Sequence, residues 1–85
     1  MEELYRAIEE KIKASGYPDS VDGFEIYSDL SDQIEGKENG EYVLMSKREE
    51  DCWYEYRVQI MEDEFNLSVL IIHTQKQDYH IDFDL

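Results

Sequence analysis

The spacing of the apolar residues changes once along the chain, near residue 40, and this change constrains the fold more than any other feature. Before it, apolar residues recur every three or four positions, which is the period of an α-helix. After it, apolar and polar residues alternate, which is the period of a β-strand. Helices followed by strands are typical of the α+β class, in which the strands form an antiparallel sheet.

Two helices are predicted in the first part of the chain. Residues 2–15 form the first helix, with an apolar face made of Leu4, Ile8 and Ile12. Residues 22–35 form the second helix, with an apolar face made of Ile26, Tyr27, Leu30 and Ile34. Asp22 is placed to cap the start of the second helix, and Gly16 and Gly36 stand where C-terminal caps are expected.

Four strands are predicted in the second part, over residues 41–47, 52–61, 65–73 and 78–85. Strands that follow one another through short turns usually pair as neighbours, which gives a meander. We therefore expect an ααββββ order, with both N-terminal helices packed on one face of a four-stranded antiparallel sheet. The register of the last strand stays open, because turns of different length place His80 on different faces.

The composition indicates one small acidic domain over residues 1–85 and excludes several kinds of partner. The chain has 85 residues, and its 22 acids against 8 bases give a net charge of −14. An apolar share of 41% and an aromatic share of 13% argue against disorder. The excess of acids counts against direct binding to nucleic acid or to anionic membranes. The longest apolar run, residues 69–72, is too short to span a membrane.

The single cysteine and the N-terminal residues bear on the compartment. Cys52 has no second cysteine with which to form an internal disulfide. The first residues are acidic and lack the apolar segment of a signal peptide. We therefore expect a soluble protein of the reducing cytoplasm.

The most specific feature is a row of acids predicted on the outer face of the second helix. This acidic row consists of Asp22, Glu25, Asp29, Asp32 and Glu35, with no base between Asp19 and Glu35. Like charges at spacings of three and four residues destabilise a helix. A regular line of carboxylates also resembles the anions of a nucleic-acid backbone. Two interpretations stand: a surface that occupies the basic groove of a nucleic-acid-binding protein, or a solvated face that aids solubility.

The second face of the predicted sheet is apolar in places. Trp53, Arg57 and Met61 lie four residues apart on the side of their strand away from the core. The third strand is apolar on both sides, with Leu67, Val69 and Ile71 on one side and Leu70 and Ile72 on the other. Either this face is an exposed patch through which the protein forms a homodimer, or another part of the chain covers it.

The sequence gives little support for a metal site or a catalytic site. Asp78, His80, Asp82 and Asp84 share one face of the last strand, and His73 is expected close across the hairpin. Neighbours on such a face stand about 6.6 Å apart along the strand, which is too far for two of them to share an ion. Cys52 follows three acids and points to the core side, which favours a core cysteine over a nucleophile. We expect no catalytic residues, no metal and no cofactor.

The sequence thus favours a non-catalytic protein that binds a macromolecule. The first hypothesis is an acidic nucleic-acid mimic, which inhibits or modulates a basic nucleic-acid-binding protein through the acidic row. The alternative is a small structural or assembly domain, which self-associates through the sheet face that carries Trp53, Arg57 and Met61.

Overall fold

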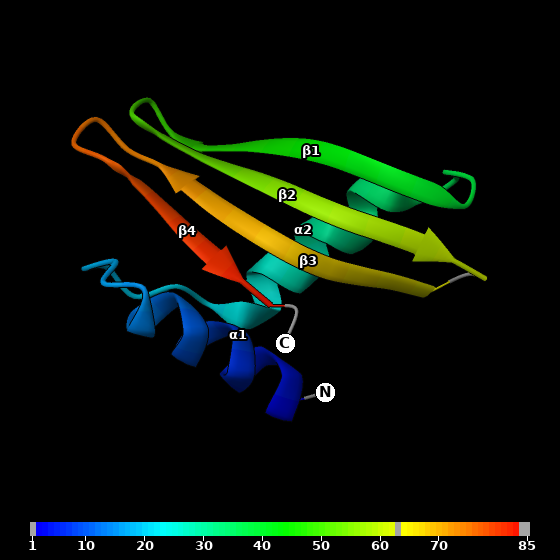
Figure 1. Cartoon of the computed structure of the whole chain (residues 1–85), viewed down its shortest axis with the longest axis horizontal. Coiled ribbons are helices and arrows are strands. Elements are labelled where there is room, and N and C mark those ends of the chain that lie inside the picture. The colour runs from blue at the N-terminus through cyan, green and yellow to red at the C-terminus, as the bar shows by residue number, and fades with distance from the viewer. Residues whose placement is uncertain (1, 63, 84–85) are drawn as a thin grey trace. The chain divides into compact units, whose positions relative to one another are not determined.

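The computed structural model describes residues 2–62 and 64–83 of the chain. Its elements are α1 (Glu2–Ala14), α2 (Gly23–Ile34), β1 (Gly40–Glu49), β2 (Cys52–Met61), β3 (Glu64–His73) and β4 (Asp78–Asp82) (Figure 1). The α+β class and the predicted order of two helices and four strands are confirmed. The chain divides into a helical unit that ends at Gly36 and a sheet unit that starts at Lys37. The packing of the helices on one face of the sheet and the single domain over residues 1–85 stay predictions.

In the helical unit, α1 and α2 meet closely at the start of α2. The amide of Gly23 donates a hydrogen bond of 2.8 Å to the Glu9 carboxylate on α1. A Cβ atom at Gly23 would collide with the backbone of Tyr5, so only glycine allows this approach. Asp22 is the predicted N-cap, and its carboxylate accepts a hydrogen bond of 2.9 Å from the amide of Phe24. Side chains from both helices therefore satisfy the first amides of α2.

The apolar core of the helical unit follows the predicted stripes in most positions. Its buried residues are Ile8, Ile12, Ile26 and Leu30, none of which is more than 5% exposed. The prediction is wrong at Leu4, which is 43% exposed. A row of residues four apart turns about 40° per step around a helix, so Leu4 lies about 80° from Ile12. Tyr5 packs edge-on against Phe24 and Tyr27 instead, at centroid distances of 5.5 and 5.7 Å.

The sheet unit is the predicted antiparallel meander, with the order β1-β2-β3-β4 (Figure 1). β1 extends from Gly40 to Glu49, beyond the predicted residues 41–47. This extension is possible because the register shifts between Lys47 and Glu49, which lets a charged segment continue the pairing with β2. β4 ends at Asp82, before the predicted residue 85. Residues 84–85 lie outside the described part of the chain.

A bulge in β3 reverses the alternation of its side chains. Arg57 pairs with Val69 but the next residue, Val58, pairs with Leu67, so Ser68 is the extra residue. The Ser68 hydroxyl donates a hydrogen bond of 2.9 Å to the Arg57 carbonyl oxygen. Leu67 therefore lies on the side of Val58, and Val69 on the side of Arg57. The prediction that Leu67, Val69 and Ile71 share one side is wrong for this reason.

The two faces of the sheet differ in burial. The buried face carries side chains that are at most 6% exposed: Tyr54, Tyr56, Val58, Ile60, Leu70, Ile72 and Ile81. The opposite side, here called the open face, carries four large apolar side chains that are 40 to 61% exposed: Val43, Met45, Trp53 and Met61. The pairing of His73 with Asp78 fixes the register that the sequence left open, and it places His80 opposite Ile71 on the open face.

Candidate functional site

The β1–β2 half of the open face mixes exposed apolar side chains with charges of both signs. Val43 is 61% exposed and Met45 is 46% exposed, and they pair with Arg57 and Glu55 respectively. Lys47 pairs with Trp53, and its Nζ lies 5.7 Å from the centroid of the indole ring. Each apolar side chain on one strand thus faces a charged side chain on the other. Because diagonal neighbours on a sheet are also within reach, Val43, Met45 and Trp53 form one group of exposed apolar side chains.

The three residues that the sequence placed on this face are all found there. Trp53 is 40% exposed, Met61 is 58% exposed, and the Arg57 side chain is 51% exposed. Trp53 and Met61 stand about 26 Å apart along β2, so they do not belong to one patch. The apolar group lies at the Trp53 end of β2, and Met61 lies at the other end of the strand.

Val43 and Met45 also lie on this face, although the sequence pattern did not indicate them. Residues 42–45 read Tyr-Val-Leu-Met, so apolar residues occupy consecutive positions and alternation does not show which of them face outward. The register with β2 decides it: Val43 and Met45 share the side of Arg57, and Leu44 shares the side of Tyr56. The only sequence signal is the presence of Glu41 and Lys47 at the same alternation as Val43 and Met45.

A chain of charged side chains crosses the open face from β2 to β4. His73 on β3 lies between two carboxylates, with Nε2 3.1 Å from Glu55 Oε1 and Nδ1 2.9 Å from Asp78 Oδ1. The second oxygen of Glu55 accepts a hydrogen bond of 3.1 Å from Arg57 Nε. This arrangement orders polar groups beside the exposed apolar ones, as at the polar rim of a protein interface.

Both central members of this charged chain have shifted pKa values. The hydrogen bond from His73 is the main cause that lowers the pKa of Glu55 below its ordinary 4.5, and Arg57 adds to it against the opposing effect of burial. For His73, burial is the largest single effect and lowers the pKa. The hydrogen bonds to Asp78 and Glu55 and their negative charges outweigh it, so the pKa rises above its ordinary 6.5. The fold therefore favours the charged form of both residues.

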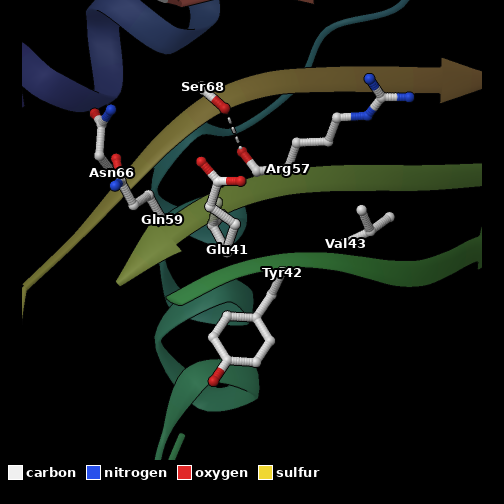
Figure 2. Close-up of a pocket in the computed structure, with 8 residues that line it drawn as sticks. Glu41, Tyr42, Val43, Arg57, Gln59, Asn66 and Ser68 are labelled. Carbon is white, nitrogen blue, oxygen red and sulfur yellow. Dashed lines mark hydrogen bonds between the residues drawn. The ribbon is translucent and has the colours of Figure 1, made fainter. Parts of the chain in front are cut away.

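A hollow of about 430 Å³ lies on the same sheet, toward the start of β1. Figure 2 shows Glu41, Gln59 and Asn66 projecting from three neighbouring strands toward one side, while Tyr42 points to the other. The Ser68 hydroxyl also borders the hollow, next to its hydrogen bond with the Arg57 carbonyl. Carboxylate, amide and hydroxyl groups line this hollow together with the apolar residues Val43 and Val58. We interpret it as a part of the open face with a mixed polar and apolar lining.

The acidic row is exposed but shorter than predicted. Asp22, Glu25, Asp32 and Glu35 are exposed, and Asp29 is half-buried and accepts a hydrogen bond of 3.3 Å from Gln33. Asp22 is the N-cap of α2 and Glu35 its C-cap, so only Glu25, Asp29 and Asp32 stand on the helix itself. Within the described part of the chain, no lysine or arginine forms an ion pair with Glu25, Asp32 or Glu35.

The candidates for metal binding and for catalysis lie on β4 and at the start of β2. Asp78, His80 and Asp82 share the open face, as their alternation predicts, and Asp84 lies outside the described residues. Over residues 2–62 and 64–83, no three His, Cys, Asp or Glu side chains are arranged to hold one metal ion. Cys52 is half-buried at the start of β2. No helix among the described residues is both long and apolar enough to cross a membrane.

Comparison of the chain with models of protein families, with curated proteins and with solved structures gives no match. The geometry of the open face and of the acidic row is therefore the basis on which a function is assigned.

Proposed function

We propose that the protein is a non-catalytic binding protein and that the open face of its sheet docks another protein. The observation that carries this proposal is the group of Val43, Met45 and Trp53, which are 40 to 61% exposed on two paired strands. Their burial in a complex is favourable by about 25 cal/mol per Å² of apolar surface. Tryptophan, methionine and arginine are also the residue types that protein interfaces favour.

The charges on the open face indicate the chemistry of the partner. Around the apolar group, the two acids Glu41 and Glu55 balance the two bases Lys47 and Arg57. β4 carries the acids Asp78 and Asp82 and no lysine or arginine, and Asp78 also contacts His73. A complementary partner has apolar side chains opposite Trp53 and basic side chains opposite β4. Such charge complementarity speeds association and makes it sensitive to salt.

Affinity capture with one matched pair of variants tests this proposal. Trp53→Ala removes an exposed aromatic side chain from the open face, and Phe24→Ala removes one that is 55% exposed from the helical unit. Truncation of a tryptophan at the centre of an interface typically costs about 2 kcal/mol or more, which is about 30-fold in affinity. We expect Trp53→Ala to lose the captured partner and Phe24→Ala to retain it. Equal recovery with both variants contradicts the proposal.

A second function is favoured by one observation in the helical unit. Glu25, Asp32 and Glu35 are exposed and have no ion pair with a described lysine or arginine, in a chain with a net charge of −14. This excess of anions supports competition with nucleic acid for the basic groove of another protein. Asp29→Lys with Asp32→Lys tests it. Capture of a nucleic-acid-binding protein that is lost with this variant and at high salt supports the mimic, whereas retention under both conditions contradicts it.

A further inference from the structure

β1 lies at one end of the sheet order, so only one of its two edges is paired. It pairs with β2, and no other described strand pairs with it. It is 10 residues long and contains no proline, whereas β4, at the other end of the sheet, has 5 residues. The outward N–H and C=O groups of such an edge strand are a template on which another strand can add. The long edge of β1 is therefore a candidate interface.

The charges of β1 favour a second copy of this chain as the added strand. Glu41 and Glu49 balance Lys47 and Arg48, so the strand has no net charge in a chain of −14. The repulsion between two acidic copies is therefore weak at this edge, because charges beyond about 8 Å are screened at physiological salt. Glu41 and Lys47, both exposed on the open face, stand at equal distances from Leu44 in the sequence.

We infer that β1 pairs antiparallel with β1 of a second copy, about a two-fold axis at Leu44. In this register Leu44 lies opposite Leu44 of the other copy, and Val43 lies opposite Met45. Glu41 of each copy lies opposite Lys47 of the other, on the same face of the extended sheet. The two sheets of four strands become one sheet of eight. Two ion pairs and three apolar pairs form across the new ladder, each of a type that stabilises paired strands.

Neighbouring registers lose these contacts. A register that keeps every side chain on its own face differs by a slide of two residues. In one direction, the slide places Val43 opposite Lys47 and moves Glu41 opposite the residues after Lys47, where the register is irregular. In the other direction, Glu41 lies opposite Met45, and Lys47 lies opposite the residue before β1. Neither charge then faces an opposite charge, so the register centred on Leu44 is favoured.

The cation–π contact with Trp53 holds Lys47 on the face where it pairs with Glu41 of the second copy. Lys47 Nζ stands 5.7 Å from the Trp53 ring centroid, which keeps the lysine on the open face. Pairing through the β1 edge leaves the open face itself uncovered. The dimer therefore does not depend on the docking of another protein there, and each can fail without the other.

Sedimentation velocity of the purified full chain over a range of concentrations tests this dimer. Glu41→Lys or Lys47→Glu alone turns two attractive contacts into two repulsive ones, and we expect each to raise the dimer dissociation constant about tenfold or more. An equimolar mixture of the two variants restores both pairs in a heterodimer, and so does the double variant Glu41→Lys with Lys47→Glu. We expect both to recover the affinity of the wild type.

Two controls make the same charge changes elsewhere in the sheet unit. Glu64→Lys and Lys76→Glu are exposed positions outside β1, and we expect neither to weaken the dimer as the β1 swaps do. A wild-type chain that stays monomeric at every concentration overturns the inference. So does a dimer that is indifferent to the β1 swaps, or a mixture of the two variants that does not associate. Trp53→Ala, which tests the docking of another protein, removes the contact with Lys47 but leaves both charged residues of β1 in place, and it is expected to remain dimeric.

Discussion

The imidazole Nε2 of His73 lies 3.1 Å from Oε1 of Glu55, and the two residues belong to neighbouring strands of the sheet. The other ring nitrogen lies 2.9 Å from Asp78 Oδ1 on the next strand. A histidine between two carboxylates is held in one orientation on the open face, beside the exposed apolar group. Its protonation therefore links the stability of the sheet unit to pH.

The first prediction concerns this linkage. The pKa of His73 is raised in the fold, so its contribution to stability is complete below the ordinary 6.5 and is lost as pH rises through the folded value. The pKa of Glu55 is lowered, so its contribution is complete above the ordinary 4.5 and is lost as pH falls through the folded value. The pair contributes most between these two ordinary values.

Urea unfolding of His73→Gln measures this contribution. We expect the variant to lose about 0.5–1 kcal/mol at a pH of about 5.5, because these side chains are partly exposed and the ion pairs are partly screened. The loss shrinks at a pH above the raised pKa of His73, where the histidine is neutral. His80→Gln, an exposed histidine on the same face, is the control. A loss of stability that is the same at both pH values contradicts the assignment.

The second prediction concerns the contact between Gly23 and Tyr5. Alanine in place of glycine within a helix usually stabilises it by about 1 kcal/mol. At Gly23 a Cβ atom would meet the Tyr5 backbone, which cannot move aside as a flexible side chain does. We therefore expect Gly23→Ala to destabilise the protein by about 2 kcal/mol or more. A stabilising effect in urea unfolding shows that the two helices do not approach each other at this point.

Gly23 is buried, and its control is Gly16, which is exposed. No atom lies within 4 Å of a Cβ built at Gly16, but its φ of +95° is unfavourable for other residues. Gly16→Ala is therefore expected to cost only about 1 kcal/mol, from backbone strain alone. A larger loss for Gly16→Ala than for Gly23→Ala would contradict this ranking.

The third prediction separates Trp53 from the residues that hold the fold together. Leu70 is fully buried, and Leu70→Ala is expected to destabilise the protein by about 2–5 kcal/mol. Trp53 is 40% exposed. Trp53→Ala removes its partial packing on the sheet and its contact with Lys47, which is worth about 0.5–1 kcal/mol at an exposed site, so we expect a smaller loss than for Leu70→Ala. The measurement is urea unfolding followed by circular dichroism. If Trp53→Ala lowers the free energy of unfolding as much as Leu70→Ala does, Trp53 is part of the core and its exposure does not indicate a binding role.

The parts of the fold that depend on local sequence were predictable. The change from helical to strand period gives the elements in order, and Asp22 is recognised as an N-cap from its residue type and place. On β2, strict alternation separates the buried Tyr54 and Tyr56 from the exposed Trp53 and Arg57. These features depend on neighbours within a few residues, and sequence patterns report such neighbours directly.

The features that depend on pairing between distant residues were not predictable. Ser68 is one residue in an apolar strand, and only the register with β2 reveals the bulge that reverses the alternation there. The position of His73 between Glu55 and Asp78 also requires the register of three strands. At Gly23 the sequence shows a glycine but not the Tyr5 backbone against it. The open face was therefore predicted in part, through Trp53, Arg57 and Met61, but without Val43, Met45 and the charged chain.

The docking of another protein on the open face is tested most directly by quantitative affinity capture with the wild type, Trp53→Ala and Phe24→Ala. Both variants remove an exposed aromatic side chain, and only Trp53→Ala removes it from the open face. We predict that a partner captured by the wild type is retained by Phe24→Ala and lost by Trp53→Ala. A partner that Trp53→Ala retains, and that only the change of Asp29 and Asp32 to lysine releases, would contradict docking on the open face and assign binding to the acidic row.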